Sequence, residues 1–180
     1  MPLLMLKDLP QYDCLLKAAG RYPTLDPTAN EAFLHLLRTG DMVFEDIGHF
    51  LTRHNISQGR LTVMILLHRP WLTTFTPASL ADESGVTRAT MTGLIDTLEK
   101  DGMVIRQADA QDRRTVHVSL TEQGCAILEM MLPDYFACIS RIIQPLTVPE
   151  RKELVRLLQK IQEGLTPVDS KPSTQTLAAE

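Results

Sequence analysis

A group of cationic and hydroxyl side chains between residues 87 and 114 has the chemistry to bind an anionic polymer. A guanidinium group can hold a phosphate oxygen or a guanine edge, and a threonine can contact phosphates, base edges or thymine methyl groups. The chain as a whole is acidic, because 22 aspartates and glutamates exceed 18 lysines and arginines and give a net charge of −4. Binding must therefore come from a local patch. Its candidate members are Thr87, Arg88, Thr90, Thr92, Lys100, Arg113 and Arg114.

The spacing of residues 76–102 predicts two helices joined by a tight turn. Thr76 and Pro77 are typical of a helix start, and Gly85 can end that helix in a left-handed conformation. A second helix is predicted over residues 88–100, where apolar residues recur with helical spacing. They are Met91, Leu94, Ile95 and Leu98. The opposite face lets a major groove approach closely because it is made of small and polar residues, namely Ala89, Gly93, Asp96 and Lys100.

Residues 103–120 change to the two-residue period of β-strands. Apolar positions alternate on either side of a polar stretch from Gln107 to Arg114, which predicts a hairpin with a charged tip. A helix-turn-helix followed by such a hairpin is a winged helix, so the predicted fold class is mainly α with a small β-hairpin wing. The alternative for Arg113 and Arg114 is a solvated charge pair in a loop, and for each threonine it is ordinary exposed helix surface.

Four runs of sequence carry a resemblance to a known family. They are Ser57–Arg60, Thr76–Ala81, Gly85–Gly102 and, above all, Asp112-Arg113-Arg114 followed by Leu120-Thr121-Glu122-Gln123-Gly124. Over about residues 28–164 the chain resembles the MarR (multiple antibiotic resistance regulator) family. The resemblance implies a homodimeric winged-helix transcription regulator, usually a repressor, that binds double-stranded DNA. It further implies that Arg113 enters a minor groove, whereas Arg114 either contacts a phosphate or pairs with an acid.

The resemblance also implies how the chain is divided. Apolar stripes on the helices at both ends agree with a role in dimerisation, because one small winged domain offers them no partner. In a two-fold dimer the recognition helices face consecutive major grooves roughly 34 Å apart, so the operator is expected to be a pseudopalindrome. The expected parts are an N-terminal extension (1–26), a dimerisation helix (27–56), the winged helix-turn-helix (57–120), C-terminal dimerisation helices (121–165) and a flexible tail (166–180).

Members of the resembled family commonly release DNA when a small aromatic or phenolic anion binds between the dimerisation helices and the winged domain. Here a carboxylate and a ring could be held by cationic or imidazole groups beside aromatic side chains. The candidates are Phe50, Arg53, His54, His68, Arg69 and Trp71. The alternative is that the arginines are surface charges and that Trp71 packs at a helix end.

Two other switches remain open from the sequence. One branch of the family senses hydroperoxides through a cysteine near tyrosines, and Cys14 lies close to Tyr12 and Tyr22. Cys125 and Cys138 have apolar neighbours typical of packing residues. A metal switch has weaker support. It rests on the i, i+4 pair Glu45 and His49 with His54 further along, which is more typical of a solvated helix face.

The sequence disfavours other classes of protein. It has no phosphate-binding or dinucleotide glycine motif, zinc-protease motif or nucleophile elbow, so we expect neither an enzyme nor a bound cofactor. No apolar run is long enough to span a membrane, and three cysteines fit a reducing compartment, so a cytoplasmic location is expected. The remaining rival is a winged helix that binds another protein and not DNA.

Overall fold

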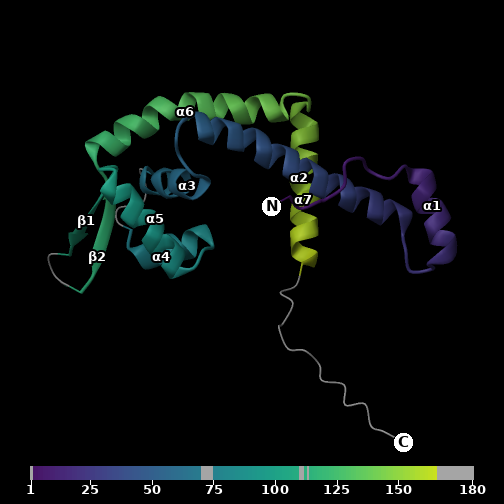
Figure 1. Ribbon diagram of the computed structural model, residues 1–180, viewed down its shortest axis with the longest axis horizontal. Coiled ribbons are helices and arrows are strands. Elements are labelled where there is room, and N and C mark those ends of the chain that lie inside the picture. The colour runs from purple at the N-terminus through teal and green to yellow at the C-terminus, as the bar shows by residue number, and fades with distance from the viewer. Residues whose placement is uncertain (1, 70–74, 110–111, 113, 166–180) are drawn as a thin grey trace, which may run out of the picture. The chain divides into compact units, whose positions relative to one another are not determined.

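The computed structural model describes residues 2–69, 75–109, 112 and 114–165. These form two compact units, which divide the chain between residues 139 and 140. The first contains α1 (Tyr12–Arg21), α2 (Pro27–Arg53), α3 (Gln58–Leu67), α4 (Pro77–Ser84), α5 (Arg88–Lys100), β1 (Val104–Ala108), β2 (Val116–Leu120) and most of α6 (Glu122–Ile143). The second contains the end of α6 and α7 (Val148–Gly164) (Figure 1). The predicted fold class, mainly α with a β-hairpin wing, is confirmed.

The first helix of the helix-turn-helix begins at Thr76 and ends at Gly85, as the sequence predicts. Thr76 accepts a hydrogen bond from the backbone N–H of Ser79 at 3.1 Å, and the Ser79 hydroxyl accepts one from the N–H of Thr76 at 2.9 Å. Gly85 ends α4 with φ of +66°, a conformation that costs a glycine little. Thr87 then caps α5 by accepting a hydrogen bond from the N–H of Thr90 at 3.1 Å. These caps fix the angle at which α5 leaves α4.

The apolar stripe of α5 forms the centre of the winged domain. Met91, Ile95 and Leu98 are fully buried, and so are Leu61 and Met64 of α3 and Leu80 of α4. Leu94, also predicted in the stripe, is only partly buried and packs against Gly59, where a Cβ atom would come within 3.0 Å of it. Figure 1 shows α3, α4, α5 and the hairpin grouped together. The packing turns the opposite face of α5 to the outside.

The wing is a two-stranded antiparallel hairpin. Val104 pairs with Leu120, and the register continues to Ala108 opposite Val116. Phe75, which is buried, adds a bridge to β2 through its carbonyl, which accepts a hydrogen bond from the N–H of Val118 at 2.7 Å. The hairpin is thereby fixed to the segment that leads into α4.

A close approach of two chain segments joins the wing to α6. The Thr121 hydroxyl donates to the carbonyl of Gly102 at 2.7 Å and accepts from the N–H of Gly124 at 2.9 Å. The N–H of Thr121 donates to the carbonyl of Met103 at 3.1 Å. A Cβ atom at Gly124 would lie 2.0 Å from that carbonyl oxygen, so only glycine fits there. This contact explains in physical terms why a threonine and a glycine stand three residues apart in the motif.

The N-terminal extension contains a helix, α1, that the sequence analysis does not predict. The segment before it lies on α2. There Asp41 accepts hydrogen bonds from the N–H groups of Leu3 at 2.6 Å and Leu4 at 2.9 Å. Arg38 donates to the carbonyls of Leu6 and Lys7. Apolar side chains of this segment, such as Leu3, are nevertheless exposed.

The second unit has one capped helix with an exposed apolar stripe. Glu150 accepts hydrogen bonds from the N–H of Thr147 at 2.7 Å and from its hydroxyl at 2.6 Å, and this capping box begins α7. The stripe comprises Leu154, Leu157, Ile161 and Leu165, all of them exposed. Of the helices described in the two units, none has a stretch apolar and long enough to cross a lipid bilayer.

Candidate nucleic-acid interface

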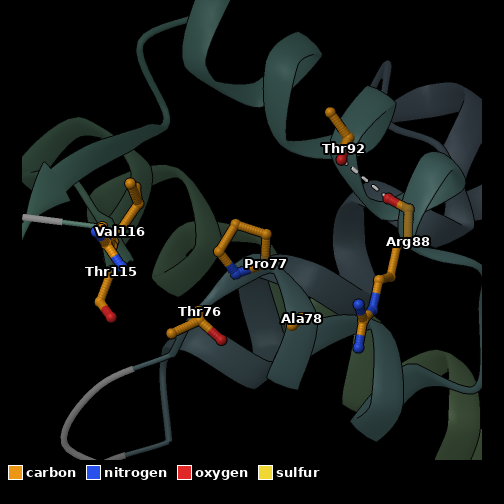
Figure 2. A pocket seen from close by; sticks show the side chains of 8 residues that line it. Thr76, Pro77, Ala78, Arg88, Thr92, Thr115 and Val116 are labelled. Carbon is orange, nitrogen blue, oxygen red and sulfur yellow. Dashed lines mark hydrogen bonds between the residues drawn. The ribbon is translucent and has the colours of Figure 1, made fainter.

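An open depression of about 430 Å³ lies where α4, α5 and the wing meet. Its lining comprises Thr76, Pro77, Ala78, Arg88, Thr92, Arg114, Thr115 and Val116. Figure 2 shows Pro77 and Ala78 at the start of α4, with Arg88 and Thr92 to one side and Thr115 and Val116 to the other. The structure therefore brings together two predicted cationic residues, Arg88 and Arg114, that are 26 positions apart in the chain.

The guanidinium groups of this depression are available to a ligand. Within the described part of the chain, no hydrogen bond or ion pair engages the side chain of Arg88 or Arg114, and both residues are exposed. Asp112 does not pair with the Arg114 guanidinium. It accepts hydrogen bonds from the N–H of Arg114 at 3.0 Å and the hydroxyl of Thr115 at 3.1 Å, and so shapes the turn. Among the described residues no acid pairs with the Arg114 guanidinium.

The three predicted threonines are exposed, but their hydroxyl groups already have partners. Thr87 and Thr90 share a hydrogen bond of 2.9 Å between their hydroxyls. The Thr92 hydroxyl donates to the carbonyl of Arg88 at 2.9 Å (Figure 2), so its proton is not available to a phosphate. What Thr92 offers outward is mainly its methyl group. Lys100 is exposed at the last turn of α5, and Arg113 lies outside the described residues.

The acidic residues near the end of α5 are paired with arginines that the sequence analysis does not single out. Arg106 of β1 binds Asp96 at 2.6 Å and Glu99 at 2.5 Å. Arg60 of α3 binds Asp101, the residue that caps the end of α5. Burial acts to lower the pKa of Arg106, but the hydrogen bonds with Asp96 and Glu99 outweigh it and raise that pKa above its ordinary value. The two arginines thus hold carboxylates that would repel an anion.

The candidate effector residues face different neighbours. Phe50 is 1% exposed and packs against the rings of His54 and Tyr135, with centroids 4.4 and 5.6 Å apart. His54 faces Asp134 of α6 at 4.0 Å, and His68 faces Glu129 of α6 at 3.9 Å.

Arg69 lies 3.7 Å from Glu83 of α4, and Arg53 is exposed. Trp71 lies outside the described residues. The depression beside α5 and a smaller cavity beside Gly40 are both lined by other residues. An acid faces each of His54, His68 and Arg69, so a carboxylate ligand would have to displace that acid.

The residues of the two other switches are not arranged around a common site. Cys14 is exposed and lies on α1, the helix that precedes the long α2, and not near the start of α2. Cys138 is buried, and its thiol donates to Asp46 at 3.7 Å. Over the residues that the structure describes, no three histidine, cysteine, aspartate or glutamate side chains are placed to hold a metal ion, so Glu45, His49 and His54 do not form such a site.

The fold and this surface define a class of protein. A capped helix-turn-helix packs against a two-stranded wing, and unpaired arginines from the helix and from the wing lie beside the same depression. This is the architecture of a winged-helix DNA-binding protein, in which one helix enters the major groove and the wing contacts the adjacent backbone or minor groove.

Comparison with known proteins specifies the class further. A model of the MarR family matches residues 56–116. The HTH-type transcriptional repressor YetL of Bacillus subtilis is 32% identical over 161 residues, which cover 89% of this chain and 96% of YetL. This chain belongs to the MarR family and is a DNA-binding transcription regulator.

Solved structures show the same fold. AbsC, a MarR family transcriptional regulator of Streptomyces coelicolor, has a TM-score of 0.72 at 20% identity, over 78% of this chain and 95% of AbsC. BpsR of Bordetella bronchiseptica has a TM-score of 0.63 at 24% identity, over 72% of this chain and 91% of BpsR. The DNA binding of BpsR is regulated by 6-hydroxynicotinic acid.

Proposed function

We propose that this regulator is a homodimeric repressor that binds a pseudopalindromic operator through α5 and the wing, and that a small aromatic acid releases it. The observation that carries the DNA-binding part is the depression between α4, α5 and the wing, in which Arg88 and Arg114 have unpaired guanidinium groups. Arg88 at the start of α5 is placed to reach a base edge or phosphate, and Arg114 at the wing to reach the phosphate backbone. Arg113 remains the predicted minor-groove residue.

The homodimer is supported by where apolar side chains remain exposed. Between residues 57 and 120 only Val86 and Ile105 are large, apolar and exposed among the described residues. The N-terminal 44 residues and α7 contain many more, among them Phe33, Phe44 and Leu157. Apolar surface of this kind favours burial against another chain, and a second copy offers the same surface in return.

The first experiment measures fluorescence anisotropy of labelled DNA taken from immediately upstream of the protein's own gene, with scrambled DNA as control, at several salt concentrations. We expect selective binding that weakens steeply with salt. Arg88→Gln and Arg114→Gln should each weaken binding about tenfold and, with two copies per dimer, reduce the salt slope by about 1.8. Arg21→Gln, at an exposed arginine of α1, is the matched control and should leave the slope unchanged.

One result would contradict the DNA-binding proposal, and another would contradict the role of Arg113 in it. Binding that is equally weak on all DNA, both upstream and in an operator selection from the whole genome, would favour a protein-interaction module. Loss of the dimer in Arg113→Ala, measured by light scattering, would remove Arg113 from the interface with DNA. Each variant is checked by circular dichroism, so that a loss of binding is not a loss of fold.

The effector part of the proposal is supported by the regulation of the structural neighbour BpsR by an aromatic acid. Phe50 packs against the ring of Tyr135 in α6, and His54 and His68 face acids of α6 that the carboxylate of the ligand would displace. The probe is 6-hydroxynicotinic acid, and its amide, which lacks the carboxylate, is the matched control. We expect the acid to weaken DNA binding in a saturable way and the amide not to. If neither that acid nor a panel of other aromatic acids changes DNA affinity or melting temperature, the effector class is wrong.

A further inference from the structure

The C-terminal half of α5 carries acidic groups where a DNA-binding helix should be neutral or positive. Asp96 lies on the outward face with Gly93 and Lys100, and its side chain is 58% exposed. Glu99 follows within one helical turn, and its side chain is 38% exposed. An unpaired carboxylate at either position would repel a phosphate backbone over roughly one Debye length, about 8 Å at physiological salt. A regulator that uses this face needs a way to cancel those charges.

A single arginine from the wing contacts both carboxylates. Arg106 in β1 donates through Nη2 to Asp96 at 2.6 Å and through Nη1 to Glu99 at 2.5 Å. Its backbone N–H also donates to Glu99, at 3.2 Å. The side chain of Arg106 is only 25% exposed, so its charge is directed at these two acids and not at solvent. Main chain and side chain together fix β1 to α5.

We propose that Arg106 is a positioning residue for DNA recognition: it neutralises Asp96 and Glu99 at the DNA-facing side of α5 and sets the angle between α5 and the wing. The inference rests on the proposed use of α5 and the wing in DNA binding. It assigns Arg106 an indirect role, because the two terminal nitrogens that would grip a phosphate are occupied by carboxylates. Arg106 acts through the groups it holds, whereas Arg88 and Arg114 are unpaired.

The indirect role of Arg106 can be distinguished from direct DNA contact by combining substitutions. Removing the charge of Arg106 leaves two carboxylates unpaired, which should lower the affinity for DNA. Removing those carboxylates as well should restore that affinity. A residue that contacts phosphate directly cannot be rescued in this way, because its own contact stays absent. The informative variants are therefore Arg106→Gln, Arg106→Lys and the triple variant Arg106→Gln/Asp96→Asn/Glu99→Gln.

The test uses the full-length protein and measures anisotropy of its operator DNA across a salt series. Arg106→Gln should weaken binding about tenfold, and the triple variant should bind within about threefold of the wild type. Arg106→Lys keeps the charge but cannot grip two acids at once, so it should lie between them. Arg156→Gln is the matched control. Arg156 pairs with Glu153 at 2.7 Å in α7, and its removal changes the net charge by the same amount.

Each remaining outcome decides the inference in a recognisable way. Weak binding that the triple variant does not restore, with a reduced salt slope, means that Arg106 touches DNA itself. Unchanged binding by Arg106→Gln means that the carboxylates do not matter to DNA. If Arg106→Gln does not fold, the folded variant Arg106→Lys takes its place. Wild-type DNA affinity in Arg106→Lys would overturn the positioning role, whereas a loss of DNA affinity that the added change Asp96→Asn relieves would support it. A wild-type protein that binds no DNA removes the proposed function together with this inference.

Discussion

Replacing Gly124 with alanine tests the close approach that joins the wing to α6. The added Cβ atom would lie 2.0 Å from the carbonyl oxygen of Met103, and 2.9 Å from its carbonyl carbon. Both are backbone atoms and cannot turn aside as a flexible side chain would. The start of α6 must therefore move away from the start of β1 by more than about 1 Å to reach an ordinary contact distance.

The energetic cost follows from what that movement breaks. Overpacking at a rigid contact costs about 1–3 kcal/mol. The hydrogen bond from the N–H of Thr121 to Met103 is already 3.1 Å long, and stretching it loses roughly 1 kcal/mol more. Better helix propensity returns at most about 1 kcal/mol. With the full return from helix propensity, the net loss of unfolding free energy is about 1–3 kcal/mol, which corresponds to a melting temperature lower by about 2–12 °C.

Differential scanning fluorimetry at one fixed protein concentration measures this shift, because the melting temperature of the proposed dimer would depend on concentration. The matched control is Gly93→Ala. It makes the same chemical change inside a helix where a Cβ atom meets nothing within 4 Å, and it should raise stability by about 0.5–1 kcal/mol. A Gly124→Ala protein that melts within about 1 °C of the wild type would refute the close contact between Gly124 and the carbonyl of Met103. It would also refute the explanation of why the motif has a glycine at this position.

Further predictions concern three other parts of the chain. Gly93→Leu should keep the fold but weaken DNA binding at least about tenfold, since the side chain fills space on the outward face of α5; unchanged affinity would place DNA elsewhere. Phe50→Ala should cost about 3–5 kcal/mol in urea denaturation because Phe50 is 1% exposed, and a loss below about 1 kcal/mol would contradict its core position. The pKa of Asp41 is lowered by the hydrogen bond from the N–H of Leu3 and, to a smaller extent, by that from Leu4. The attachment of the N-terminal segment should therefore be complete above the ordinary pKa of 3.8 and be lost as the pH falls through the lowered pKa. Amide exchange of Leu3 and Leu4 checks this, and Asp41→Ala should expose the segment to limited proteolysis at pH 7; protection equal to that of the wild type would refute the anchor.

The winged helix could be predicted from sequence because its boundaries are set by local chemistry. Thr76, Thr87 and Gly85 act on residues within one helical turn of themselves, so their effect is visible in a short stretch of sequence. The apolar spacing of α5 is local in the same sense. The strand pairing was predictable because the two strands are close in sequence and alternate with one period.

The pairing of charges could not be predicted in the same way. Arg60 and Asp101 are 41 residues apart, and their contact depends on how α3 packs against the end of α5. Arg106 and Asp96 are only ten residues apart, but whether they meet depends on the angle between a helix and a strand. A partial signal did exist for Arg106, because it is a cation on a strand that directly follows a helix with two outward acids. The effector candidates were harder still, since His54, His68 and Arg69 each have an acid opposite them that only the folded chain reveals.

If DNA binds at the proposed interface of α5 and the wing, the pattern of pairing explains how a chain whose net charge is −4 can bind it. Screening limits the reach of a surface charge to about 8 Å at physiological salt, so acids distant from the interface carry little weight there. Near α5, the carboxylates of Asp96, Glu99 and Asp101 are held by arginines, whereas Arg88 and Arg114 are unpaired in the described structure. The local potential is thus set by which charges are paired and not by composition. It follows that breaking one of these pairs should disturb DNA binding more than adding a single acidic residue on a surface far from α5.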